Sequence, residues 1–304
     1  VSAPDTAYKI HFDTGETQDA CSDHEWEVEV KNKGTQVLTT QEMFDSGVSV
    51  GPKKEARFKI KTTKPLDLPE QDVPVDPYTF GVWLGDKTFR PGEVTLHKDD
   101  LDILKSMEHY KGLHQQPVGE DNIRTTVYGL RGLLRGMNVV QDKRIPVQYL
   151  RSSYSQRLSL LQGLMDIGAI ESSRTKAQCG IVLESKTLAV DVLHLVSTLG
   201  LKPTIKELTI NGSIHFEVTF LAFSEEIEVF RLPRRLAKMK TKADKRQQHS
   251  TKHRSIEKIE EVEADHMRCI GVDNADKLYL FGDTCIPTHN SITSAAYLLW
   301  YAIF

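Results

Sequence analysis

The sequence predicts a mostly β domain that carries an inserted α/β domain, and two observations lead to this prediction. Short strand-like runs with alternating polar and apolar residues occupy both ends of the chain, within residues 8–61 and 256–281. Between them, over residues 78–230, apolar residues recur at helical spacing and are interleaved with further strand-like runs. The same β texture on both sides of an α/β block favours one β domain interrupted by an insertion.

The composition sets the broad class of protein. With 304 residues the chain is long enough for two domains. A charged fraction of 27% and a formal net charge of -3 give no global nucleic-acid signature, so any DNA binding must come from local charge. The four cysteines stand at wide and irregular spacing, which predicts neither a disulfide framework nor a zinc site and favours a reducing compartment.

Neither a signal peptide nor an apolar run of membrane-spanning length appears in the sequence. The apolar run at residues 295–304 is too short to cross a bilayer. We therefore expect a cytoplasmic location and no membrane partner.

The first β segment contains expected strands at residues 8–12 and 25–30, followed by strand-like runs at residues 37–40 and 56–61. Four prolines between residues 65 and 77 rule out a continuous helix or a central strand there. We place a domain boundary in this stretch. Residues 1–72 are then the first part of the β domain, and residues 73–230 are the insertion.

A basic stretch follows the insertion. Ten Lys and Arg residues and the single acid Asp244 fall within residues 231–254, which predicts a solvated basic linker over residues 231–253. Strand-like runs then return, so residues 254–290 are the second part of the β domain and residues 291–304 are a flank.

The second β segment ends in a specific pattern, in which strand-like residues 267–272 and 278–281 precede Thr288, His289, Asn290 and Ser291. This pattern resembles the end of an intein, a protein-splicing domain of the Hedgehog/intein (HINT) fold. The resemblance implies that the Asn290 amide attacks its own carbonyl, that His289 assists, and that Ser291 accepts the upstream flank as an ester. The partners of such a domain are its own flanking exteins.

A second intein-like block lies upstream. Cys21, Ser22, Asp23 and His24, followed by Glu25, resemble the internal block whose histidine sits beside the first scissile peptide. The resemblance makes His24 the candidate for breaking that peptide, and it puts Cys21 where the family commonly has threonine. The alternative for an isolated histidine at a strand start is a ring satisfied by solvent or backbone.

Two departures from the family pattern bear on activity. The chain opens with Val1 and Ser2 rather than with a first block and its nucleophile, so we expect a missing N-terminal intein segment, either truncated or supplied as a separate chain. Lys277 stands where many relatives have a histidine, and Asp273 is the nearby polar candidate for proton handling during asparagine cyclisation.

The insertion contains two helices of one type. Residues 78–86, which end at Asp86, resemble the first LAGLIDADG helix of intein-borne homing endonucleases. In that family two such helices pack through small residues, so that one carboxylate from each helix end shares divalent cations. The resemblance makes Asp86 a metal ligand and Mg²⁺ the cofactor of DNA cleavage. A plain core helix is the alternative for this apolar run.

The second helix, residues 156–166, matches the family closely, but Asp166 is followed by Ile-Gly where the family has Thr-Asp. Aligned without gaps, Gly168 replaces the catalytic aspartate; aligned with a one-residue deletion, the aspartate is simply absent. Asp166 reaches the site only if the helix end rearranges. Because the loss of one bridging carboxylate removes transition-state stabilisation, we expect weak or no cleavage.

The rest of the insertion resembles the same family, whose strands form a saddle on double-stranded DNA. Arg90, Lys98, Arg174 and Lys176 are candidates for phosphate contacts, with solvated surface as the alternative for each. Residues 291–304 resemble the helix after a Walker A loop in P-loop ATPases such as phage terminase large subunits. The cell would then be bacterial or phage-infected.

Three hypotheses about function follow from these patterns. The leading one is a self-processing domain that catalyses its own splicing. The second is a DNA-binding or site-specific DNA-cleaving protein whose β domain is passive, and Gly168 argues against cleavage but not against binding. The third is a folded fragment without chemistry.

Overall fold

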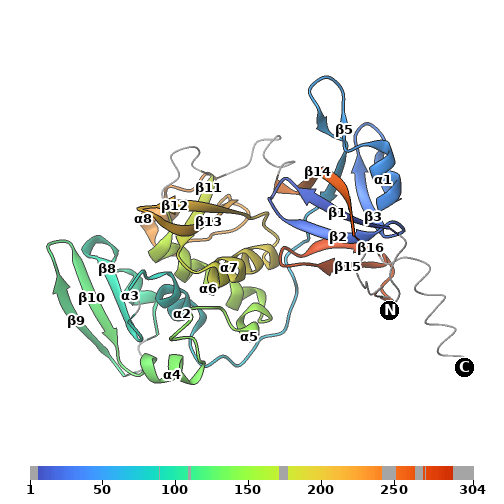
Figure 1. Ribbon diagram of the computed structural model, residues 1–304. Helices are drawn as coiled ribbons and strands as arrows, with labels where there is room; N and C mark the ends of the chain where they lie inside the picture. The colour runs from blue at the N-terminus through green and yellow to red at the C-terminus, as the bar shows by residue number, and fades with distance from the viewer. Residues whose placement is uncertain are drawn as a thin grey trace, which may run out of the picture. The chain divides into compact units, whose positions relative to one another are not determined.

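The computed structural model describes residues 6–88, 90–108, 111–170, 177–241, 251–263, 270 and 272–289. The chain forms two units. Unit 1 comprises Val1–Thr63 and Arg246–Phe304, and unit 2 comprises Lys64–Lys245 (Figure 1). The fold class is mixed α/β with antiparallel strand pairs, as the sequence predicts at this coarse level. No helix of the described residues is long and apolar enough to cross a membrane.

Unit 1 is built on a six-stranded sheet with the order β2-β1-β14-β7-β3-β4. Its strands are β1 (Ala7–Phe12), β2 (Thr17–Cys21), β3 (Glu25–Val30), β4 (Gly34–Thr39), β7 (Phe58–Lys61) and β14 (His253–Val262). Two strand pairs and one helix accompany the sheet: β5 (Ser49–Val50) with β6 (Glu55–Ala56), β15 (Leu278–Phe281) with β16 (Ile286–His289), and α1 (Thr40–Ser46).

Alternation along the strands explains the core of unit 1. In β3, Trp26, Val28 and Val30 are buried, while the glutamates between them are partly exposed. β1 shows the same pattern with Ile10 and Phe12. Because each fully buried side chain of this size contributes roughly 1.5–3 kcal/mol, the pattern fixes which face of the sheet is inside.

Strands from the two ends of the chain pair directly in unit 1. β1 runs antiparallel to β14 with Ala7 opposite Val262, and β14 also pairs with β7, with His253 opposite Lys61. The sheet is therefore continuous across the insertion point. The strands of this sheet thus come from both sides of the stretch Lys64–Lys245.

Unit 2 contains one arrangement twice. The first copy consists of α2 (Pro77–Gly85), β8 (Glu93–His97), η1 (Lys98–Asp100), α3 (Ile103–Ser106), β9 (Leu113–Val118) and β10 (Asn122–Val127). The second consists of α6 (Tyr154–Gly168), β11 (Gln178–Leu183), α7 (Lys186–Thr198), β12 (Thr204–Ile210) and β13 (Ser213–Leu221). In both sheets the third strand of the copy lies in the middle, as the orders β8-β10-β9 and β11-β13-β12 show. The described elements α4 (Leu130–Gly136), α5 (Val147–Leu150) and α8 (Pro233–Leu236) complete the unit.

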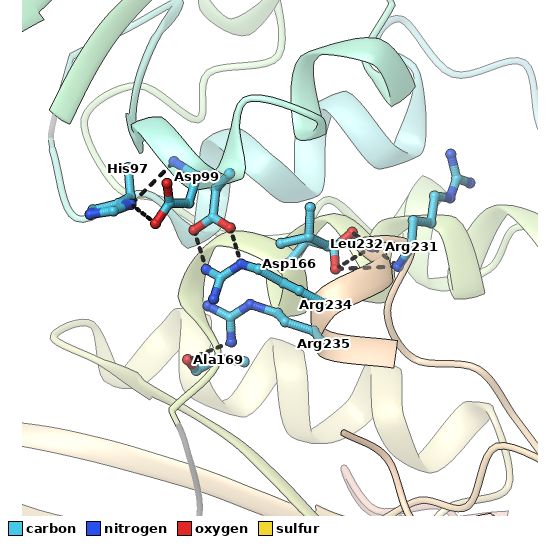
Figure 2. A network of polar contacts seen from close by, with 9 residues as sticks. His97, Asp99, Asp166, Ala169, Arg231, Leu232, Arg234 and Arg235 are labelled. Atoms are coloured by element: carbon cyan, nitrogen blue, oxygen red, sulfur yellow. Dashed lines mark hydrogen bonds and ion pairs between the residues drawn. The ribbon is translucent and has the colours of Figure 1, made fainter. Parts of the chain in front are cut away.

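The unit boundaries differ from the sequence prediction. They fall at residues 63/64 and 245/246 rather than 72/73 and 230/231, and the described part of the predicted linker, residues 231–241, belongs to unit 2. Residues 231–241 are held in unit 2 by a buried carboxylate: Arg234 donates from Nε and Nη2 to the two carboxylate oxygens of Asp100, each at 2.5 Å. Figure 2 shows this paired contact and its neighbours.

Candidate functional site

The first candidate site lies in unit 1 around His24, in the turn between β2 and β3. Its backbone is held on both sides, because the His24 N–H donates to the Cys21 carbonyl at 3.2 Å and the Thr40 N–H donates to the His24 carbonyl at 2.9 Å. The His24 ring meets the Trp26 ring edge-on, with centroids 4.9 Å apart. Trp26 is in turn fixed by its Nε1–H, which donates to Thr40 Oγ1 at 3.0 Å. The position of the imidazole is therefore set by the strand and helix that follow it.

Strand β16 brings the end of the described chain to this histidine. Nε2 of His24 is hydrogen bonded to the hydroxyl of Thr288, a residue 264 positions away, and that threonine is 1% exposed. Beside this contact, Nδ1 of His289 lies 3.1 Å from Oε2 of Glu25. Thr288 and His289 of β16 thus contact His24 and Glu25, which stand just before and at the start of β3. The two histidines named by the sequence lie in one site of one unit.

The environment keeps His24 neutral. Burial, and to a smaller extent the nearby His289, lower the pKa of His24 from 6.5 to about 4. At neutral pH the His24 ring therefore has one N–H donor and one acceptor nitrogen. A ring in this state can pass a proton or hold an oxygen atom by hydrogen bonding.

The other residues predicted for this site have different outcomes. Cys21 ends β2 in a partly buried position, is not in a disulfide, and contributes its carbonyl to His24. Asp273 is exposed and precedes β15. Asn290 and Ser291 lie outside the described residues. Sequence reasoning missed Glu25, whose contact with His289 arises from strand packing and leaves no local signal.

The second candidate site lies in unit 2, where α2 and α6 pack closely. A Cβ on Gly81 would stand 2.2 Å from the Leu160 carbonyl oxygen, and a Cβ on Gly163 would stand 2.2 Å from the Tyr78 carbonyl oxygen. Each glycine thus meets the residue three positions before the other. Only glycine allows this approach, which agrees with the expectation that the two helices pack through small residues.

This reciprocity relates the two helices residue by residue. Because Gly81 corresponds to Gly163, Asp86 corresponds to Gly168, five positions later on each helix. Helix α6 runs without a break through Gly168, where a Cβ would lie 3.2 Å from the Gly85 carbonyl oxygen. On this correspondence the chain's own two helices align without a gap, while the alignment of α6 with the family stays a prediction. Gly168 occupies the position that faces the Asp86 end of α2.

Asp86 is buried at the C-terminal end of α2. Its Oδ2 accepts hydrogen bonds from the Thr88 hydroxyl and, at 3.2 Å, from the Thr95 N–H. Burial raises the pKa of this carboxyl, and the bonds from Thr88 and the charge of Lys143 oppose the rise. Lys143 was not singled out by sequence reasoning, since it lies 57 positions away from Asp86.

Lys143 closes the C-terminal end of α2. Its Nζ donates to the carbonyl oxygens of Asp86 at 2.6 Å and Trp83 at 2.9 Å, which suits a cation at the negative end of a helix. Burial lowers the pKa of Lys143 to about 8, while Asp86 and Glu184 oppose the fall. A cavity of 160 Å³ lies beside these groups, and its lining includes Asp86, Lys143, Glu184 and His215.

The Asp166 carboxylate is hydrogen bonded to other parts of unit 2. It accepts from the Tyr78 hydroxyl at 2.7 Å. It also accepts from the backbone N–H groups of Arg231 and Leu232, at 3.0 and 3.1 Å (Figure 2). The residue is 0% exposed. These bonds anchor the segment that leads into α8, so Asp166 is a structural carboxylate here and not a replacement for the missing one.

The described residues of unit 2 do not fit a shared two-cation centre. Gly168 offers no oxygen from its side chain, Asp166 is directed to α8, and Asp86 is the remaining carboxylate of the predicted set. No group of three or more His, Cys, Asp or Glu side chains among the described residues is arranged to hold a metal ion. Asp86 as a single Mg²⁺ ligand stays a prediction.

Two of the predicted phosphate contacts already have acidic partners. Lys98 lies 2.6 Å from Asp121, and Arg90 lies 3.8 Å from Glu93. Arg174 and Lys176 lie outside the described residues. Surface ion pairs of this kind are worth little, so these contacts do not decide whether the basic groups meet DNA.

Known proteins resemble this chain in sequence or in structure. No family model matches the sequence. The chain is 29% identical over 317 residues to "Replicative DNA helicase DnaB" from Mycobacterium intracellulare, an alignment that covers 96% of the chain and 51% of that protein. The chain therefore spans about half the length of this curated relative.

Similar solved structures are those of I-DmoI, described as a homing endonuclease. The complex of I-DmoI with DNA and Ca has a TM-score of 0.36 and 15% identity, and it covers 54% of this chain and 95% of that chain. The complex with DNA and Mn has a TM-score of 0.35 and 14% identity, with coverages of 50% and 92%. TM-scores this low assign no function to the chain.

Proposed function

We propose that the chain is an intein, in which unit 1 is a protein-splicing domain and unit 2 is an inserted LAGLIDADG-type domain. One observation carries the proposal: the segments that hold His24 and His289, named from separate sequence motifs, contact each other in the same β unit, through the pairs His24–Thr288 and Glu25–His289. A further argument is that unit 2 is a single stretch of chain, Lys64–Lys245, between the two parts of unit 1.

The chemistry proposed at the C-terminal junction is asparagine cyclisation. The side-chain nitrogen of Asn290 attacks the carbonyl carbon of Asn290, a succinimide C–N bond forms, and the peptide C–N bond to Ser291 breaks. The attacking nitrogen loses a proton and the leaving amine of Ser291 gains one. His289 is the group proposed to move this proton, and Ser291 is proposed as the nucleophile that first receives the upstream flank as an ester.

The proposed host is a replicative helicase of the DnaB type. The relative with that name is about twice as long as the matched segment, as expected for a host protein that carries an intein. The resemblance of residues 291–304 to a terminase finds no support in the comparisons, and we replace it with the helicase. Those residues would then belong to the downstream extein.

Mass spectrometry tests the splicing proposal directly. The purified chain is incubated at neutral pH, and we expect release of the peptide made of residues 291–304. The Asn290→Ala variant is the matched control, because it keeps the fold but lacks the attacking amide. Release that persists in this variant, or no release from the unchanged chain, would contradict the proposal.

A second proposed activity is DNA binding by unit 2 with little or no cleavage. The duplicated arrangement and the reciprocal glycine contacts favour a LAGLIDADG-type pair of helices, and the pairing of Asp86 with Gly168 leaves one carboxylate where two are needed. Binding and cleavage are therefore expected to separate in this chain.

Restoring the carboxylate tests this second activity. In Gly168→Asp, the new Cβ meets Ile181 Cδ1 at 2.7 Å, a side-chain end that can shift. With Mg²⁺ and DNA carrying the uninterrupted host gene, we expect no nicking by the unchanged chain and measurable nicking by Gly168→Asp. Gly168→Asp combined with Asp86→Asn is the control and should be inactive. Nicking by the unchanged chain would show the nuclease to be intact.

A further inference from the structure

Positive charge is concentrated in one part of unit 1, which we call the basic patch. The patch consists of residues 29–33 and 51–61. These two segments hold two acids, Glu29 and Glu55, and seven basic residues, namely Lys31, Lys33, Lys53, Lys54, Arg57, Lys59 and Lys61. The whole chain, in contrast, has a formal net charge of -3. The patch therefore supplies a local charge that the overall composition conceals.

Strand pairing brings the two segments of the patch together. In the register of β3 with β7, Glu29 lies opposite Lys59. Just beyond β3, the Lys31 N–H donates to the Arg57 carbonyl at 2.9 Å, and the Lys31 ammonium forms an ion pair with Glu55 of β6. Figure 1 shows the β5–β6 hairpin at one end of unit 1. The charges of both segments thus add in one region of the surface.

Most of the positive charge of the patch is not balanced by acids. Within the described part of the chain, five of its lysines make no ion pair: Lys33, Lys53, Lys54, Lys59 and Lys61. All of them are exposed except Lys59, which is half-buried. The two acids already have partners, because Glu55 pairs with Lys31 and Glu29 pairs with His253 at 2.9 Å. The patch therefore presents net positive charge to solvent.

The spacing of the lysines on β7 suits a phosphate backbone. Phe58 and Ile60 are each 1% exposed and belong to the core, so Lys59 and Lys61 project from the opposite face of the strand. Alternate residues of a strand are about 6.6 Å apart. Successive phosphates of one DNA strand rise by about 3.4 Å along the helix axis. The two lysines therefore keep step with every second phosphate.

A lipid surface matches the patch less well. Proteins that lie on a membrane place apolar side chains beside their basic ones. Neither segment of the patch contains an exposed large hydrophobic residue. Among the described residues of unit 1, such side chains stand on other segments, at Val37, Phe44, Ile270, Leu280 and Phe281. The patch thus fits a hydrophilic polyanion.

We propose that the basic patch of unit 1 binds the phosphate backbone of double-stranded DNA, independently of base sequence. This inference goes beyond the proposed function, which assigns DNA binding to unit 2, and it does not depend on splicing. Lysines that neutralise phosphates release counterions from the DNA, so binding through the patch weakens steeply as salt is added.

The test measures binding of the full chain to a short duplex of unrelated sequence, by fluorescence anisotropy over a range of salt concentrations. Lys59→Gln combined with Lys61→Gln removes two charges from one face of β7. This double variant should bind about tenfold more weakly at low salt, and the slope of log K against log salt should fall by about 2.

The matched control is Lys9→Gln combined with Lys258→Gln. It removes two charges from β1 and β14 of the same sheet and leaves the patch intact. The slope of this control should stay close to that of the unchanged chain. Equal slopes in the two double variants would overturn the inference, since net charge alone would then govern binding.

Amide NMR separates this inference from DNA binding by unit 2. On addition of the duplex, resonances of residues 51–61 should shift. Shifts confined to unit 2 would overturn the inference without contradicting DNA binding there. Shifts confined to the patch would support it and contradict DNA binding by unit 2.

Two other polyanions complete the test, namely a polyglutamate peptide and phosphatidylserine vesicles. Each is titrated with the unchanged chain and with the β7 double variant. Binding that is much weaker than that of the duplex would support the assignment to DNA. Binding of either one as tight as that of the duplex, with the same loss in the variant, would overturn it.

Discussion

Single residues in unit 1 show how burial shifts the pKa of a histidine. The His24 ring meets the Trp26 ring edge-on and contacts the Thr288 hydroxyl. Burial and, as a smaller cause, the nearby His289 disfavour its charged form and lower its pKa. Glu25, one position later, lies with Oε2 3.1 Å from Nδ1 of His289. Residues 24 and 25 thus contact Thr288 and His289, two consecutive residues of β16.

The His24 environment predicts a pH dependence of stability. The pKa of His24 in the folded chain is lowered from 6.5 to about 4. Between these two pH values His24 is therefore protonated in the unfolded chain but neutral in the folded chain. The free energy of unfolding of unit 1 should therefore fall by about 2–3 kcal/mol as the pH drops from 6.5 to 4, with no contribution from this residue above 6.5. Hydrogen exchange of the Val28 amide in denaturant measures it.

The matched variant for this prediction is His24→Gln, which keeps a polar side chain but does not titrate. Its unfolding free energy should change less with pH over the same interval. An equal slope in both proteins would assign the effect to other groups.

At the scale of elements, the packing of α2 against α6 decides the geometry of unit 2. Gly81 and Gly163 allow the helix backbones to touch, and this approach brings the C-terminal ends of both helices together at Asp86 and Gly168. Lys143 then binds the carbonyl groups at the end of α2. The close approach and the lysine at the end of α2 thus set the geometry of the helix pair.

Adding one methyl group at this contact should be costly. In Gly163→Ala the new carbon would stand 2.2 Å from the Tyr78 carbonyl oxygen, and backbone atoms cannot move aside as a side-chain end can. We expect a loss of unfolding free energy of at least about 1–3 kcal/mol, measured by denaturant unfolding of unit 2.

Gly132→Ala is the control for that substitution. Gly132 lies inside α4 and has open space around its missing Cβ. Alanine there should raise the unfolding free energy by about 0.5–1 kcal/mol. Similar losses in both variants would mean that helix propensity, not helix contact, governs position 163.

These elements also show what the sequence can predict. The strands expected at residues 8–12 and 25–30 follow from alternation and turn residues, and their positions agree with β1 and β3. The helices at residues 78–86 and 156–166, and their packing through small residues, were implied by the resemblance to the LAGLIDADG family, and their positions agree with α2 and α6. Local sequence supports such predictions because the pattern and the structure share one period.

Other features could not be predicted, for identifiable reasons. Glu25 meets His289 across 264 positions, and Lys143 meets the end of α2 across 57, so neither contact has a local pattern. Residues 231–241 have the composition of a linker, yet they are bound within unit 2. The Arg234 side chain donates to Asp100, and the Arg231 backbone N–H donates to Asp166. A run of basic residues predicts a solvent-exposed segment only where no buried carboxylate binds those residues instead.

In the whole molecule, the two units do not follow each other along the chain, because unit 2 lies between the two parts of unit 1 in sequence. Unit 2 is one continuous stretch, whereas unit 1 needs residues from both ends, as in the pairing of Ala7 with Val262. Closing a long flexible loop costs about 0.6 kcal/mol more for each doubling of its length. A folded unit 2 shortens the flexible part of that loop, so folding should proceed from the insertion to the β unit.

This order can be measured by pulsed hydrogen exchange during refolding. Amides of α2 and α6 should become protected before those of β14, because β14 joins strands from the opposite end of the chain. The Gly163→Ala variant should delay protection in both units if the sequence of events is obligatory. Earlier protection of β14 than of α6 would exclude this order.

The pairing of Lys61 with His253 has one further consequence. Antiparallel partners lie only about 5 Å apart, so the two points where the chain leaves and re-enters the sheet are separated by a distance that a few residues can bridge. In topological terms, the whole of unit 2 occupies the place of a tight turn. Gain or loss of unit 2 during evolution would then leave every strand register in the β unit unchanged.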